Sequence, residues 1–64
     1  MSMPQRLAVG FRVLGLARRV AGWEIVVRCG GRRYRRFWVE EDCPSRRKVR
    51  ADLQTRPEFW VEID

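Results

Sequence analysis

The sequence predicts a small α+β fold, made of an antiparallel β-meander, one short basic helix and one C-terminal strand. The meander would combine an N-terminal bent strand with a Gly-Gly hairpin. Apolar residues alternate with polar ones on both sides of Gly30-Gly31, which is the pattern of two strands joined by a tight turn. A start signal near Pro44 and a stop signal at Arg56-Pro57 enclose the helix. The hexapeptide that begins at Phe37 returns almost unchanged at Phe59, again with the alternation of a strand.

A chain of 64 residues is long enough for one domain. A chain of this size buries only about 60% of its unfolded surface, which leaves a thin margin of stability and no room for a deep catalytic cleft. Three tryptophans can supply much of a small core. We expect residues 1–5 to be a flexible N-terminus, because Pro4 discourages regular structure, and residues 6–64 to form the single domain.

The first strand is expected within residues 6–22, where two patterns compete. Alternation typical of a strand is found at Leu7, Val9, Phe11 and Val13. Spacing typical of one helix face is found at Val9, Val13, Leu16 and Val20. Gly10 and Gly15 lower helix propensity by about 1 kcal/mol each and suit bulges in a bent strand, so a strand is preferred.

Two registers are open to the hairpin around Gly30-Gly31. A two-residue turn pairs Val27 with Tyr34 and places Phe37 on the face opposite Val27. A loop one residue longer, or a bulge, gathers five apolar residues on one face: Trp23, Ile25, Val27, Phe37 and Val39. Because burial selects the register, we expect the second arrangement. Its other face then carries Glu24, Val26, Arg28, Tyr34, Arg36, Trp38 and Glu40.

The helix is expected from about Pro44 to Thr55, with a proline in its first turn. Val49 and Leu53 form its narrow apolar stripe, and basic residues crowd the rest of its surface. A strand, a helix and another strand favour a right-handed crossover. The last strand is therefore expected to run parallel to the earlier copy of its hexapeptide.

The formal net charge of +6 favours an anionic partner. Nucleic acid ranks first, an acidic protein surface second and anionic lipid third. No segment approaches the twenty apolar residues of a membrane span, and arginines occur throughout the first 22 residues, unlike a secretory signal. We therefore expect a cytoplasmic protein, in the host cytoplasm if a virus encodes it, and no membrane partner.

Motifs for catalysis or metal binding are missing from the sequence. There is no histidine, no nucleophile elbow and no phosphate-binding glycine loop, so we do not expect an enzyme. Cys29 and Cys43 cannot complete a four-ligand zinc site without histidine partners, and a disulfide is uncommon in the cytosol. Two free thiols, no metal and no cofactor are the expectation.

The basic-aromatic run from Arg32 to Trp38 is the strongest functional signal. A guanidinium group forks onto phosphate or guanine edges and stacks on rings. In the expected register Tyr34, Arg36 and Trp38 share an outward face, although a solvated ladder of arginine–glutamate pairs would use the same residues. The basic helix adds charge of the same sign. The candidate partner-binding residues are Arg32, Arg33, Tyr34, Arg35, Arg36, Trp38, Arg46, Arg47, Lys48 and Arg50.

These features predict a small nucleic-acid-binding module, for DNA or RNA, that uses the arginine-aromatic hairpin and the basic helix. One alternative is a small, phage-encoded inhibitor or regulator of a host protein machine such as RNA polymerase or a defence nuclease. It would bind an acidic protein surface or the nucleic-acid channel of a host enzyme. Another is a structural subunit whose outward tryptophans are buried by a neighbour.

The segment from Trp23 to Gln54 contains a strand, a glycine turn, a basic strand and a helix. It resembles the small DNA-binding domains at the N-termini of some tyrosine recombinases, which combine a three-stranded sheet with a helix. The resemblance implies a sheet that enters the major groove. It covers about half of the chain, and the additional C-terminal strand departs from that plan.

Overall fold

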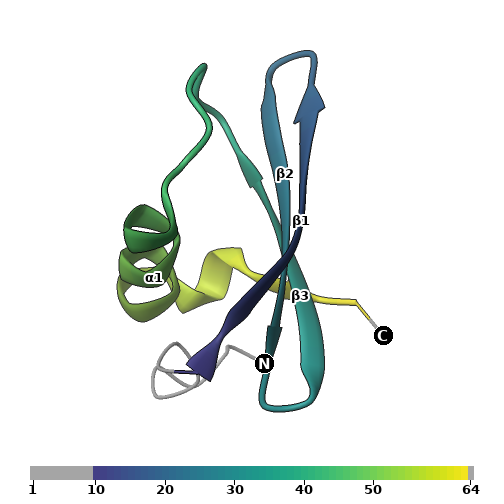
Figure 1. Cartoon of the computed structure of the whole chain (residues 1–64), viewed down its shortest axis with the longest axis vertical. Helices are drawn as coiled ribbons and strands as arrows, with labels where there is room; N and C mark the ends of the chain where they lie inside the picture. Colours follow the sequence, from purple (N-terminus) through teal and green to yellow (C-terminus); the bar gives the residue numbers. More distant parts are fainter. Residues whose placement is uncertain (1–9, 64) are drawn as a thin grey trace.

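A computed structural model of the protein describes residues 10–63. It contains a four-stranded antiparallel sheet, with strand order β1-β2-β3-β4, and one helix beside the sheet (Figure 1). The predicted α+β fold is confirmed. The expected flexible N-terminus at residues 1–5 and the start of the first strand at residues 6–9 lie outside the described residues. The elements are β1 (Arg12–Arg19), β2 (Gly22–Cys29), β3 (Arg32–Trp38), α1 (Arg46–Thr55), the 3₁₀ turn η2 (Pro57–Phe59) and β4 (Val61–Glu62).

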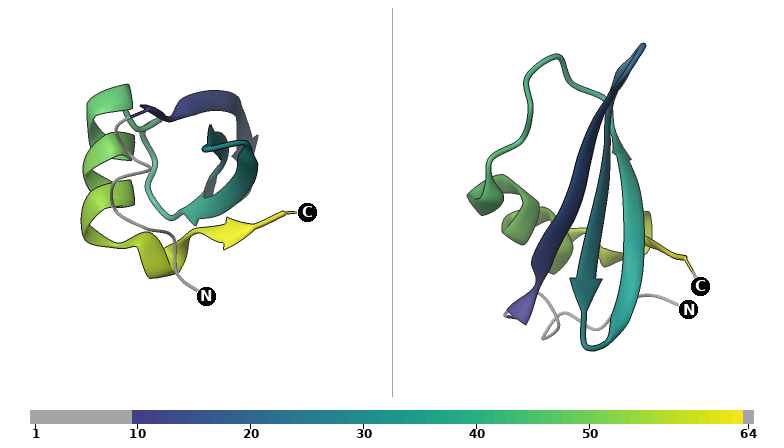
Figure 2. Two further views of the ribbon diagram at one scale, coloured as in Figure 1. Left: turned by 90° about the horizontal axis from the view of Figure 1, so that it is seen from below. Right: turned by 45° about the vertical axis from the view of Figure 1, so that its right-hand side comes forward.

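The segment after Phe11 forms a strand, as preferred from the sequence; Gly10 precedes this strand and makes no bulge in it, whereas the irregularity expected at Gly15 is present. The pairing of β1 with β2 shifts between Val13 and Gly15, which leaves Leu14 as the extra residue of a β-bulge. A bulge bends its strand and increases the local twist. The strong twist of the long strands is visible in Figure 2.

The hairpin between β2 and β3 uses the two-residue turn, so the register that we expected is wrong. Gly30 and Gly31 have φ values of 56° and 80°, and a type I′ turn requires positive φ at both central residues. Val27 pairs with Tyr34 in this register. Tyr34 and Trp38 are therefore buried, whereas the expected core residues Phe37 and Val39 are 44% and 72% exposed. The two-residue turn thus buries Tyr34 and Trp38 in place of the smaller Phe37 and Val39.

The helix α1 packs against one face of the sheet (Figure 2). It begins at Arg46, two residues later than expected, because the hydroxyl of Ser45 accepts a hydrogen bond from the Lys48 amide at 3.2 Å and caps it. Within residues 10–63, no helix has the length and apolar character needed to cross a membrane. The core contains Phe11, Ile25, Val27, Cys29, Tyr34, Trp38, Val49, Leu53 and Trp60.

The last strand β4 runs antiparallel to β3, so the expected parallel crossover is wrong. Val61 lies opposite Arg35 and Glu62 lies opposite Tyr34. The chain thus reaches β3 at its middle and runs toward its beginning, whereas a parallel strand would have to start beside Arg32. Glu62 consequently lies 3.3 Å from the guanidinium of Arg32, to which it is paired.

Residues 39–45 connect β3 to α1 at the end of the sheet opposite Gly30-Gly31 (Figure 1). Arg18 and the indole nitrogen of Trp23 both donate to the carbonyl oxygen of Glu41, at 2.6 and 3.2 Å. The guanidinium of Arg18 also lies 5.4 Å from the centre of the Trp23 ring. These contacts tie the connection to the sheet. It carries three exposed acids, Glu40, Glu41 and Asp42.

Candidate nucleic-acid interface

The face of the sheet turned away from α1 carries a row of arginines. The register sets Arg12 opposite Arg28, and Arg28 opposite Arg33, so the row crosses β1, β2 and β3. All three side chains are exposed. We call this side of the sheet the open face; its described members are Arg12, Gly15, Ala17, Arg19, Glu24, Val26, Arg28, Arg33, Arg35, Phe37 and Val61.

The arginine row is electrostatically unfavourable for the sheet. Side chains directly opposite each other on neighbouring strands have Cβ atoms about 4.5–5.5 Å apart, and like charges at these positions are destabilising. Arg12 and Arg28 form no ion pair with any residue between 10 and 63. The pairing of Arg12 with Arg28 therefore lowers the stability of the sheet, and a bound anion would relieve the repulsion.

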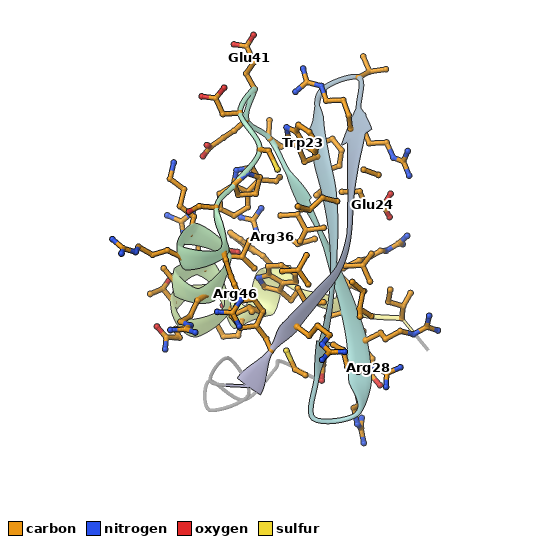
Figure 3. The ribbon with its side chains drawn as sticks, in the orientation of Figure 1. Trp23, Glu24, Arg28, Arg36, Glu41 and Arg46 are labelled. Atoms are coloured by element: carbon orange, nitrogen blue, oxygen red, sulfur yellow. The ribbon has the colours of Figure 1, made fainter. Side chains whose placement is uncertain are left out.

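Glu24 is the single acid among the described residues of the open face. One of its carboxylate oxygens lies 2.7 Å from the guanidinium of Arg19, and the other lies 3.9 Å from that of Arg35. In Figure 3, Glu24 lies on the opposite side of the sheet from Arg36, which points toward α1. Five arginines thus face one glutamate, and the open face has a clear excess of positive charge.

Two half-exposed aromatic rings lie beside this charge. Phe37 belongs to the open face, and Phe59 lies in η2 next to the strand β4. The guanidinium of Arg36 lies 5.2 Å from the centre of the Phe59 ring. Both rings line a hollow of about 400 Å³, together with Glu24, Arg35, Arg36 and Val61.

Three of the predicted site residues face the core, so the expected outward display of two rings and a cation is wrong. The rings of Tyr34 and Trp38 are buried against the helix side of the sheet. Arg36 Nε lies 2.6 Å from Asp52 Oδ2, and the Arg36 side chain is 13% exposed. This contact is an ion pair by distance, because the Nε–H bond is not aligned for a hydrogen bond. The two-residue turn, which inverts the register that we expected, turned these side chains inward.

The predicted basic residues of the helix remain exposed, but the sheet separates them from the open face. Arg46 donates to the carbonyl oxygen of Phe11 at 3.3 Å and lies 4.5 Å from the centre of its ring. Arg50 lies 5.9 Å from the same ring. The structure therefore divides the predicted site between two surfaces. Arg33 and Arg35 lie on the open face, Arg32 pairs with Glu62 at the rim, and the helix carries Arg46, Arg47, Lys48 and Arg50.

The two cysteines are free thiols in different environments. Cys29 is buried and Cys43 is exposed. Burial raises the pKa of the Cys29 thiol above its ordinary value. In the described part of the chain, histidine, cysteine, aspartate and glutamate form no group of three that could hold a metal ion.

Sequence reasoning missed Arg12 and Arg28 as members of the site. Strand alternation already places Arg28 and Val27 on opposite faces of the sheet, and the two-residue turn pairs Arg28 with Arg33. The two-residue register therefore already indicates that Arg28 and Arg33 lie side by side. The partner of Arg28 on β1 depends on the bulge at Leu14, which strand alternation does not locate. No protein family, curated protein or solved structure matches the chain.

Proposed function

We propose that the protein is a small nucleic-acid-binding module and that the open face contacts the phosphate backbone of DNA or RNA. The observation that supports this most is the row of Arg12, Arg28 and Arg33 across three strands. Guanidinium groups bind phosphate oxygens through two parallel hydrogen bonds and stay charged at all physiological pH values. Phosphates above the row would neutralise its mutual repulsion.

The position of the row on regular strands suits this role. A sheet holds the Cβ atoms of its side chains at fixed spacings, so the backbone needs no ordering when an anionic chain binds. The formal net charge of +6 attracts the polyanion from a distance. Each phosphate contact releases condensed counterions, so affinity should fall steeply as salt is added.

The test is a binding titration with a labelled oligonucleotide over a series of salt concentrations. The double variant Arg12→Gln/Arg28→Gln should bind more weakly and should flatten the plot of log affinity against log salt by roughly two units. The control is Arg47→Gln/Lys48→Gln, which removes the same charge from the helix. It should keep the wild-type slope, apart from a small loss of long-range attraction.

Two results would contradict the proposal. A wild-type protein that binds neither DNA nor RNA at low salt excludes the function. Equal losses in the two double variants would show that net charge, and not the open face, determines the affinity. Folding of each variant is checked by denaturation, where exposed charge changes are expected to stay within about 0.5 kcal/mol.

A second candidate function is a small, phage-encoded inhibitor or regulator of a host protein machine. The observation that favours it is the edge strand β1, which leaves one side of its backbone unpaired within the described sheet. Leu16 on this strand is 43% exposed and, with Phe11, Val13 and Val49, lines a hollow of about 640 Å³. A partner could add a strand here. Protein capture that survives nuclease treatment and is lost in Leu16→Asp would favour this function over the first.

A further inference from the structure

Phe37 and Phe59 lie near each other at the edge of the open face, where they border the same hollows. They share the hollow of about 400 Å³ described above, and they also line a second hollow of about 510 Å³. The second hollow is bordered by Arg36, Trp38, Val39, Glu40 and Arg56. Both rings are half exposed, so neither is a core residue.

A half-exposed ring alone is ordinary on a protein surface. Here two rings border common hollows. The exposed guanidinium of Arg35 adjoins the first hollow, whereas Arg36 borders both but is held in its ion pair with Asp52. Ring faces next to arginines are the surfaces on which unpaired bases stack, because every base has a π face and the guanidinium binds the adjacent phosphate. The hollows leave space beside the rings for such a base.

The spacing along β3 connects the rings with the arginine row. Arg33, Arg35 and Phe37 alternate on the same face, so Phe37 lies about 7 Å from Arg35 and about 13 Å from Arg33 along the strand. A backbone bound at Arg33 and Arg35 would therefore bring its next base to the ring of Phe37. The carboxylate of Glu24 in the same hollow does not add an unbalanced negative charge, because Arg19 pairs with it at 2.7 Å and Arg35, at 3.9 Å, is not needed for this.

We infer that the open face binds single-stranded nucleic acid, with one unpaired base stacked in the hollow between Phe37 and Phe59. This inference rests on the function proposed above. In a duplex the base faces are covered by their neighbours, so only a single strand can offer a base to these rings. The rings would thus select single strands, while the arginines bind any phosphate backbone.

The test compares one labelled oligonucleotide as a single strand and as a duplex, each titrated with the wild type and three variants at one low salt concentration. Wild type should bind the single strand at least about tenfold more tightly than the duplex. Phe37→Leu keeps an apolar side chain without a ring and should weaken single-strand binding roughly five- to 150-fold, with little change for the duplex. Phe37→Tyr keeps the ring and should bind like wild type. The matched control Leu16→Ala alters a residue of nearly equal exposure, 43% against 44%, on the helix side of the sheet and should change neither affinity.

Each other outcome has a defined meaning. Equal affinity for the two forms, or a loss in Phe37→Leu that is the same for both, overturns the stacking inference and leaves the phosphate-binding function in place. A loss in Leu16→Ala as large as that in Phe37→Leu overturns it as well. Absence of binding to both forms overturns the inference together with the function on which it rests.

Discussion

Arg36 and Asp52 form an ion pair inside the protein, with Nε of Arg36 at 2.6 Å from Oδ2 of Asp52. The same oxygen accepts a hydrogen bond from Nε1 of Trp60 at 2.9 Å. One carboxylate of α1 therefore joins the strand β3 and the segment before β4. The guanidinium of Arg36 also lies 4.8 Å from the centre of the Trp38 ring. An arginine on the core face of the sheet is tolerated because these groups surround it.

Asp52→Ala should lower the free energy of unfolding by about 3–5 kcal/mol, because the largely buried Arg36 loses its counter-charge. Trp60 also loses its acceptor. Urea denaturation measures the change. The control Glu62→Ala breaks the exposed pair with Arg32 and should cost at most about 1 kcal/mol. Similar losses in the two variants would show that the Arg36–Asp52 pair contributes no more than a surface pair.

Tyr34→Ala should destabilise the protein by about 3–5 kcal/mol, because the ring is part of the core and its removal leaves a cavity. Phe37→Ala, which shortens a half-exposed ring on the opposite face, should cost much less. Thermal or urea denaturation of the two variants side by side gives the ranking. A larger loss for Phe37→Ala would contradict the observed register and favour the longer loop.

Gly22→Ala should be destabilising by at least about 1–3 kcal/mol. A Cβ atom at this position, where φ is 155°, would lie within 2.1 Å of the carbonyl oxygen of Trp38, and backbone cannot move aside as a side chain can. Gly15→Ala is the matched control, because no atom lies within 4 Å of its added Cβ. If both variants have the same melting temperature, β2 and β3 do not approach as closely at Gly22 as described.

In the folded protein Cys43 should react with a thiol reagent well before Cys29. Cys43 is exposed, whereas burial shields Cys29 and raises its pKa, which lowers the fraction of reactive thiolate at neutral pH. Mass spectrometry after timed alkylation identifies the modified residue. In denaturant both thiols should react at similar rates. Preferential labelling of Cys29 under native conditions would contradict its burial.

The elements of the fold could be predicted because their signals are local. Glycines that allow positive φ identify the hairpin, and Ser45 and Pro57 bound the helix. The hairpin register could not be predicted by counting apolar residues on a face. That count treats Arg36 as an outward residue. In the structure Arg36 points inward, because it pairs with Asp52 of α1, sixteen positions later in the chain. A charge on the core face becomes acceptable only when the tertiary structure supplies its counter-charge.

The direction of β4 and the residues of the open face are also determined by contacts between segments that are distant in the sequence. The crossover rule describes long connections between full strands, but β4 contains only Val61 and Glu62 and meets β3 at its middle. The basic residues of hairpin and helix looked like one surface in the sequence. The helix covers one side of the sheet and the arginine row lies on the other, so only Arg33 and Arg35 of the predicted set belong to the proposed contact surface.

The acidic connection and the arginine row lie at opposite ends of the sheet. Figure 3 shows Glu41 at one end of the molecule and Arg28 near the other, close to the Gly30-Gly31 turn. The three acids of the connection and the arginine row thus place opposite charges near the two ends of the long axis. Under the proposed function, a polyanion would attract the arginine end and repel the acidic end, which would rotate the protein into its binding orientation before any contact forms. Such orientation speeds association more than it prolongs the complex, and it fades once the separation exceeds the screening length of about 8 Å at physiological salt.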